Sequence, residues 1–89
     1  MTNRPDLHTI FDLGDLKAPV INDLCDLEAP EPMEKILFAG AQLGPNDLFL
    51  ARLPHMPFPL LPILQQRGLT WQTHEEDDGR VLILIRSPA

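Results

Sequence analysis

Cysteine is nearly absent from this chain, which holds only Cys25, and tyrosine is absent altogether. A single thiol cannot form an internal disulfide, so a secreted scaffold held by internal disulfides is excluded. The amino terminus also lacks the basic and then apolar layout of a secretory signal. We therefore expect a cytoplasmic protein.

Basic residues and long apolar runs are scarce as well. Lysine and arginine number 7 against 13 acidic residues, giving a formal net charge of −6, and all of that net charge arises before residue 35. An acidic segment repels a phosphate backbone, so we expect no nucleic-acid partner. No apolar run approaches the roughly 20 residues of a membrane span, so we expect no membrane partner. The 89 residues suffice for one small domain.

Proline is abundant, and the 10 prolines cluster at three places that separate the predicted elements. Apolar spacing predicts helices over 33–43 and from a Pro59 N-cap to Gly68, and strands over 20–24, 47–53, 69–74 and 81–85. This βαβαββ order predicts an α/β fold, an α+β two-layer sandwich whose four-stranded mixed sheet carries two helices on one face. The wholly apolar last strand should lie inside the sheet. We expect one core beneath the helices, formed by Leu37, Leu48, Leu50, Leu61, Leu64, Trp71, Leu82 and Leu84.

The first third of the chain contains a near-repeat. The segment 10–19 recurs eleven residues later as 21–30, with seven of the ten pairs identical. Only the second copy leads directly into the first predicted helix, so we assign it the first strand. We interpret residues 1–18 as a loosely held arm, with a partner-binding strand as the alternative, and residues 19–87 as the folded domain.

Two motifs carry a resemblance to known families. Asp23-Leu24-Cys25-Asp26-Leu27-Glu28-Ala29-Pro30-Glu31-Pro32-Met33-Glu34-Lys35-Ile36-Leu37 resembles the opening of the TusA/SirA-like sulfur-carrier fold. His55-Met56-Pro57-Phe58-Pro59-Leu60, followed by Leu64, Arg67-Gly68 and Trp71, resembles the bacterial domain of unknown function 2249, a relative in that superfamily. The resemblance implies the same fold. It also implies a redox, sulfur or nitrogen-oxide related pathway, because such relatives often accompany hemerythrin-like domains.

The resemblance also implies a thiol that this chain lacks. In the sulfur carriers a Cys-Pro-x-Pro motif presents a persulfide-carrying thiol, whereas this chain has Ala29-Pro30-Glu31-Pro32 at the matching place. Cys25 is the alternative thiol, but Asp23, Asp26 and Glu28 surround it, and negative charge disfavours a thiolate. We therefore interpret Cys25 as a small structural residue.

Histidine offers the remaining chemistry. His55 follows the second predicted strand and could cap a helix, lie in solvent, or contact a ligand. The chain holds only three histidines, His8, His55 and His74, without the spacing of a ligand pair, so we expect no metal site and no cofactor. Glu31 and His55 as an acid–base pair remain a hypothesis for a small enzyme.

The predicted topology places one candidate site. A right-handed crossover makes the first two strands parallel, so both strand-to-helix turns should meet at one end of the sheet. The expected surface comprises Ala29, Pro30, Glu31, Pro32, His55, Met56, Pro57, Phe58 and Pro59. We expect a non-catalytic binding or accessory module for a protein partner or small ligand. The alternatives are a sulfur carrier using Cys25 as a displaced thiol and an enzyme using Glu31 and His55.

Overall fold

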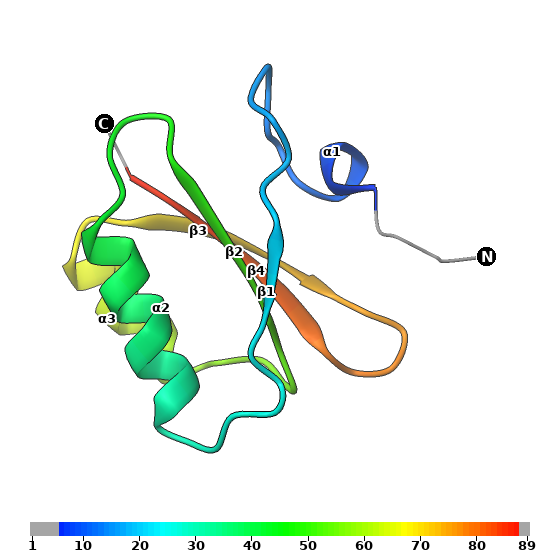
Figure 1. Cartoon of the computed structure of the whole chain (residues 1–89), viewed down its shortest axis with the longest axis vertical. Coiled ribbons are helices and arrows are strands. Elements are labelled where there is room, and N and C mark those ends of the chain that lie inside the picture. Colours follow the sequence, from blue (N-terminus) through cyan, green and yellow to red (C-terminus); the bar gives the residue numbers. More distant parts are fainter. Residues whose placement is uncertain (1–5, 88–89) are drawn as a thin grey trace.

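Four strands form one mixed sheet in the order β1-β2-β4-β3 in the computed structural model, which describes residues 6–87 (Figure 1). Strand β1 runs parallel to β2, and β4 pairs antiparallel with both β2 and β3. The first residues of the predicted arm, 1–5, and the terminal residues 88–89 lie outside the described part. The strands are β1 (Ile21–Asp23), β2 (Leu48–Leu53), β3 (Thr70–Glu75) and β4 (Val81–Arg86). The predicted α+β fold, with its last strand inside the sheet, is confirmed.

Two helices cover one face of this sheet, as predicted. Helix α2 (Glu31–Ala41) begins two residues earlier than expected. Its first turn can include Pro32, because the N–H that proline lacks would have no intrahelical partner at that position. Helix α3 (Leu60–Gln66) has Pro59 as its N-cap. Gly68 follows its C-cap residue Arg67, and the positive φ of 75° at Gly68 allows Leu69 N–H to donate to the Leu64 carbonyl at 3.0 Å. The proline-rich segment therefore forms a helix without losing a helical hydrogen bond.

The core beneath α2 and α3 follows one face of each strand. Leu64 is fully buried there, and Leu37, Leu61 and Trp71 pack against it from partly buried positions, as predicted. The buried members of this cluster, named here the helix-side core, are Leu24, Ile36, Ala51, Leu53, Leu60, Leu64, Ile83 and Ile85.

The other four residues predicted for that core lie on the opposite face of the sheet, so this part of the prediction is wrong. Leu50, Leu82 and Leu84 are buried there, and Leu48 packs against them. Strand side chains alternate between faces, and both faces of β2 and β4 are apolar, so periodicity could not say which residues face the helices. The second face buries a core of its own.

The amino-terminal arm covers this second face. Leu7, Phe11 and Leu13 are at most 9% exposed and pack on Leu50, Leu82 and Leu84; we name this group the arm-side core. The arm contains a short helix, α1 (Leu7–Ile10), that sequence reasoning missed and that Figure 1 shows on the side of the sheet away from α2 and α3. Residues 6–13 therefore pack on the sheet, a placement that the sequence did not predict.

One pair of polar contacts fastens the arm to the sheet. The amide of Asp12 donates to Gln72 Oε1 at 3.0 Å, and Gln72 Nε2 lies 3.5 Å from the Asp12 carbonyl. Within the arm itself, His8 Nε2 lies 3.0 Å from the Leu16 carbonyl. The first copy of the near-repeat therefore holds Phe11 and Leu13 against the sheet, whereas the second copy supplies strand β1.

Candidate functional site

Both strand-to-helix turns meet at one end of the sheet, because β1 and β2 are parallel. A hollow of about 330 Å³ lies between the two turns. The first turn and α2 contribute Leu27, Ala29, Pro30, Pro32, Met33 and Ile36. The second turn and its flanks contribute Leu53, Pro54, His55, Pro57, Pro59 and Leu60. We name this the corner hollow; the predicted convergence of the two turns is confirmed, whereas a binding role for it stays a prediction.

The lining of the corner hollow is mostly apolar. Its five prolines have no backbone N–H to donate, so the wall offers few donors to an anion. His55 is the titratable member of the lining; its side chain is exposed, and its Nδ1 lies 3.5 Å from the Met56 carbonyl. Such a wall suits an apolar group that makes one hydrogen bond.

Three predicted site residues do not line the hollow. Met56 is half-buried beside it, and Phe58 is 71% exposed at the surface. Glu31 instead lines a second hollow of about 540 Å³, which is also lined by Asn22, Leu24, Glu34, Lys35, Phe38 and Phe49. Glu31 and His55 thus open onto different hollows, and within residues 6–87 no hydrogen bond or ion pair joins them. The geometry does not support the acid–base pair.

Sequence reasoning missed half of the lining. Leu27, Met33, Ile36, Leu53 and Leu60 are lining residues that also belong to the helix-side core or pack against it. The apolar spacing of these residues in the sequence indicated only that they pack in a core. It could not show that the same side chains also line a hollow, because one side chain can pack against the core on one side and face the hollow on the other. Pro54 is the sixth lining residue that was missed, and its position directly before His55 is the signal that could have found it.

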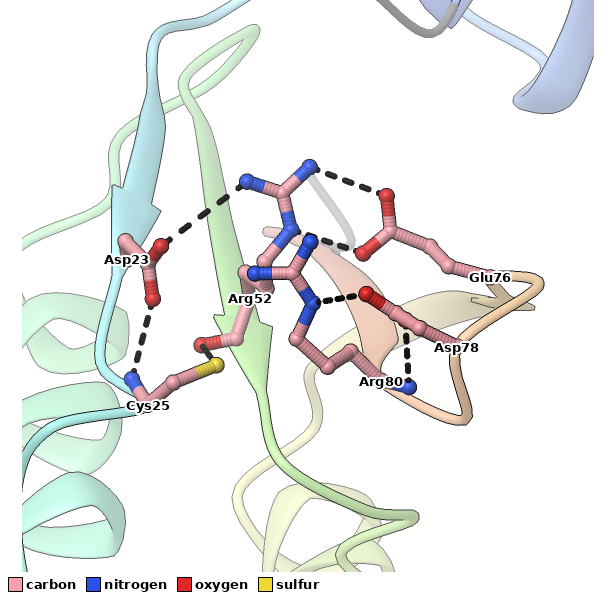
Figure 2. Close-up of polar contacts among 6 residues, drawn as sticks. All are labelled: Asp23, Cys25, Arg52, Glu76, Asp78 and Arg80. Atoms are coloured by element: carbon pink, nitrogen blue, oxygen red, sulfur yellow. Dashed lines mark hydrogen bonds and ion pairs between the residues drawn. The ribbon is translucent and has the colours of Figure 1, made fainter.

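Cys25 lies at the end of β1, outside the lining of the corner hollow (Figure 2). Its amide donates to Asp23 Oδ1 at 3.0 Å, and its Sγ donates to the Arg52 carbonyl at 3.7 Å. Burial raises the pKa of the Cys25 thiol, and the hydrogen bond and charge of Asp23 raise it further. The thiol is therefore poorly suited to carry a persulfide; burial is the largest single cause, and Asp23 adds to it.

A charged network stands beside this cysteine on the arm side of the sheet. Figure 2 shows Arg52 between Glu76 and Asp23. Arg52 Nε and Nη2 donate to the Glu76 carboxylate at 2.7 and 2.9 Å, and Arg52 Nη1 lies 3.9 Å from Asp23 Oδ2. Both side chains of the Arg52–Glu76 pair are less than one-fifth exposed. Each charge is matched, so we assign the pair a role in holding the hairpin turn to β2.

The hairpin turn carries a second ion pair, in which Arg80 Nε lies 2.6 Å from Asp78 Oδ2. Four consecutive acidic residues, 75–78, are typical of a solvated hairpin turn. That interpretation is wrong for Glu76, which reaches across the sheet to Arg52. The available signal was Arg52 itself, the charged residue within an apolar strand.

The family description Uncharacterized conserved protein (DUF2249) matches residues 22–87. The chain belongs to this family. The DUF2249 match begins at the second residue of β1, includes α2, β2, α3, β3 and β4, and leaves the amino-terminal arm outside. The resemblance that the two motifs carry is confirmed.

A solved structure supports the same fold. The crystal structure of the SirA-like protein from Desulfitobacterium hafniense is 19% identical and has a TM-score of 0.63. The similarity covers 73% of this chain and 92% of that chain. At this identity the similarity shows the fold alone, and no curated protein matches the chain. At position 29, where the resemblance to the sulfur carriers implies a thiol, this chain has alanine.

Two further properties of the described residues concern the binding of a metal ion and the crossing of a membrane. Across residues 6–87, no group of three or more histidine, cysteine or acidic side chains is placed to hold a metal ion. None of the helices in this part of the chain has the length and apolar character to cross a bilayer.

Proposed function

We propose that this chain is a non-catalytic binding module on a TusA-like scaffold, and that the corner hollow is its binding site. The observation that carries the proposal is the hollow itself, an apolar space of about 330 Å³ built from two proline-rich turns far apart in the sequence. Ligand sites of α/β sheets commonly lie at the carboxyl ends of parallel strands, as this one does.

The wall is suited to recognition. Proline fixes the backbone of both turns before binding, so a partner loses less entropy when it meets this surface. His55 adds one hydrogen-bonding group beside the apolar lining, which favours one orientation of the bound group. The scaffold has no thiol at Ala29, and Cys25 is directed to the Arg52 carbonyl. These facts favour binding over sulfur transfer, and we expect the partner in a redox, sulfur or nitrogen-oxide related pathway.

Filling the hollow tests this function. Ala29 is exposed and lines the hollow, so Ala29→Trp should occupy the space that a partner needs. Ala41 is exposed at the far end of α2, outside the lining, and Ala41→Trp is the matched control. A partner captured from the native host by the unmodified chain should be retained by Ala41→Trp and lost by Ala29→Trp.

Chemical-shift mapping with that partner gives the second measurement. We expect perturbed amides at Leu27, Ala29, Met33, His55 and Leu60. Shifts confined to the Asp77–Gly79 turn or to the arm, or capture that survives Ala29→Trp, would contradict the proposed site.

A further inference from the structure

Acidic side chains alternate with the lining residues of the corner hollow. Asp26 precedes Leu27, and Glu28 lies between Leu27 and Ala29. Both acids are exposed, and within residues 6–87 no side-chain hydrogen bond or ion pair engages their carboxylates. We name these two residues the acidic rim; Glu31, the next acid along the chain, lines the second hollow instead.

Positive charge is missing from the same corner. No lysine or arginine lines the hollow. Arg52 and Arg80 are paired with Glu76 and Asp78 on the arm side of the sheet, and Lys35 lines the second hollow. The acidic rim therefore keeps its negative potential next to an apolar space.

From this juxtaposition we propose that the corner hollow takes an apolar side chain of a protein segment whose neighbouring residues are lysine or arginine. This inference rests on the proposed function and adds the chemistry of the partner. The apolar side chain fills the hollow, and the flanking cations lie against Asp26 and Glu28. Like charge on the partner would instead be repelled, so the rim gives specificity as well as attraction.

The arrangement favours a polypeptide over a small molecule. The rim carboxylates belong to residues that flank the lining and do not themselves line the hollow, so a ligand confined to the hollow does not reach them. A polypeptide crossing the hollow does reach them, since its neighbouring side chains extend to both sides of the inserted one. The exposed ring of His55 lies at the wall, where it can exchange a hydrogen bond with the crossing backbone.

Three short peptides with blocked ends test the charge requirement in the full chain. The probe is Lys-Lys-Leu-Lys-Lys, and the comparison peptides carry serine or glutamate in place of lysine. We expect the lysine peptide to perturb amides around the corner hollow and to bind roughly tenfold more tightly than the serine peptide at low salt, since each exposed ion pair adds a little affinity. Raising the salt to about 0.5 M should remove most of that difference.

Matched variants separate the acidic rim from the net charge. Asp26→Asn and Glu28→Gln together should abolish the preference for lysine. The control combines Asp15→Asn and Glu75→Gln, which remove the same charge from exposed positions elsewhere, and it should keep the preference.

Each other outcome has a defined meaning. Equal binding of the serine and lysine peptides at the hollow would overturn the charge requirement and leave the proposed function standing. Loss of the preference in the control would assign the effect to net charge and also overturn the inference. If no peptide perturbs the hollow, the inference fails, and the Ala29→Trp capture experiment decides the proposed function separately.

Discussion

The two faces of the sheet are buried in different ways. On one face, α2 lies in the chain between β1 and β2, and α3 lies between β2 and β3. On the other face, residues 7–13 of the arm pack on the sheet and are joined to β1 by the segment 14–20. The helices are part of the DUF2249 match, and the arm precedes it. One face is thus covered by residues within the family match, and the other by residues before it.

The difference has an energetic consequence. Ordering a segment of backbone costs conformational entropy, which the burial of its apolar side chains offsets. Within residues 6–13, only Leu7, Phe11 and Leu13 are buried. Because few side chains offset the ordering of this segment, we expect the arm to open more readily than the helices.

The largest expected effect is on the helix face. Leu64 is fully buried in the helix-side core, so Leu64→Ala should destabilise the fold by about 2–5 kcal/mol, through lost apolar contact and a residual cavity. Urea unfolding measures this change. The exposed neighbour Gln65 provides the control, since Gln65→Ala should change stability by no more than about 0.5 kcal/mol. An unchanged unfolding midpoint for Leu64→Ala would contradict the placement of α3.

The arm-side core should respond differently to substitution. Phe11→Ala and Leu13→Ala should each cost about 1.5–3 kcal/mol, but together little more than either alone, because the first substitution already releases the arm. Urea unfolding of both single variants and the double variant gives the comparison, and deletion of residues 1–13 sets the upper limit. Strictly additive costs would show that the arm is as firmly held as the helices.

A third prediction concerns the charged part of the arm side. Glu76→Gln weakens the two short hydrogen bonds that it accepts from Arg52, leaving a mostly buried guanidinium with Asp23 at 3.9 Å. We expect a loss of about 1–3 kcal/mol, measured by thermal unfolding. Glu75→Gln is the matched control on the adjacent exposed residue, and it should change stability little. Equal effects of the two substitutions would refute a structural role for the pair.

Acid should weaken the same network slightly. The hydrogen bond from the Cys25 amide, aided by the charge of Arg52, lowers the pKa of Asp23 in the folded state. Its contribution to stability is present above the unfolded value of about 3.9 and is lost as the pH falls through the lower folded value. Asp23 is half exposed, so we expect less than about 1 kcal/mol. The gap in thermal midpoint between the unmodified chain and Asp23→Asn should close between pH 5 and strong acid.

The smallest expected effect concerns the reactivity of Cys25, which follows the edge strand β1. Because the pKa of its thiol is raised in the folded state, the thiolate fraction at pH 8 is below that of a free cysteine. We expect iodoacetamide to modify the folded chain more slowly than the urea-unfolded chain. Faster reaction of the folded chain, or a persulfide adduct after incubation with a sulfur donor, would restore the sulfur-carrier alternative.

Local chemistry in the sequence was sufficient for most of the elements. Prolines at the starts of α2 and α3, Gly68 after α3 and the Asp77-Asp78-Gly79 turn predicted where elements begin and end, because each acts on a few neighbouring dihedral angles. The parallel pairing of β1 and β2 followed from the handedness of the crossover, which brought His55 to the Ala29–Pro32 turn.

The tertiary structure alone decided the facing of side chains and the long-range contacts. Strand alternation separates Leu82 from Ile83 but does not say which of them faces the helices when both faces are apolar. The arm is positioned by the burial of Phe11 and by the hydrogen bond between Asp12 and Gln72. Asp12 and Gln72 are 60 positions apart in the sequence, so no local pattern could reveal their contact. The Arg52–Glu76 pair and the separation of Glu31 from His55 likewise depend on packing, since they join or divide residues that only the folded sheet places in space.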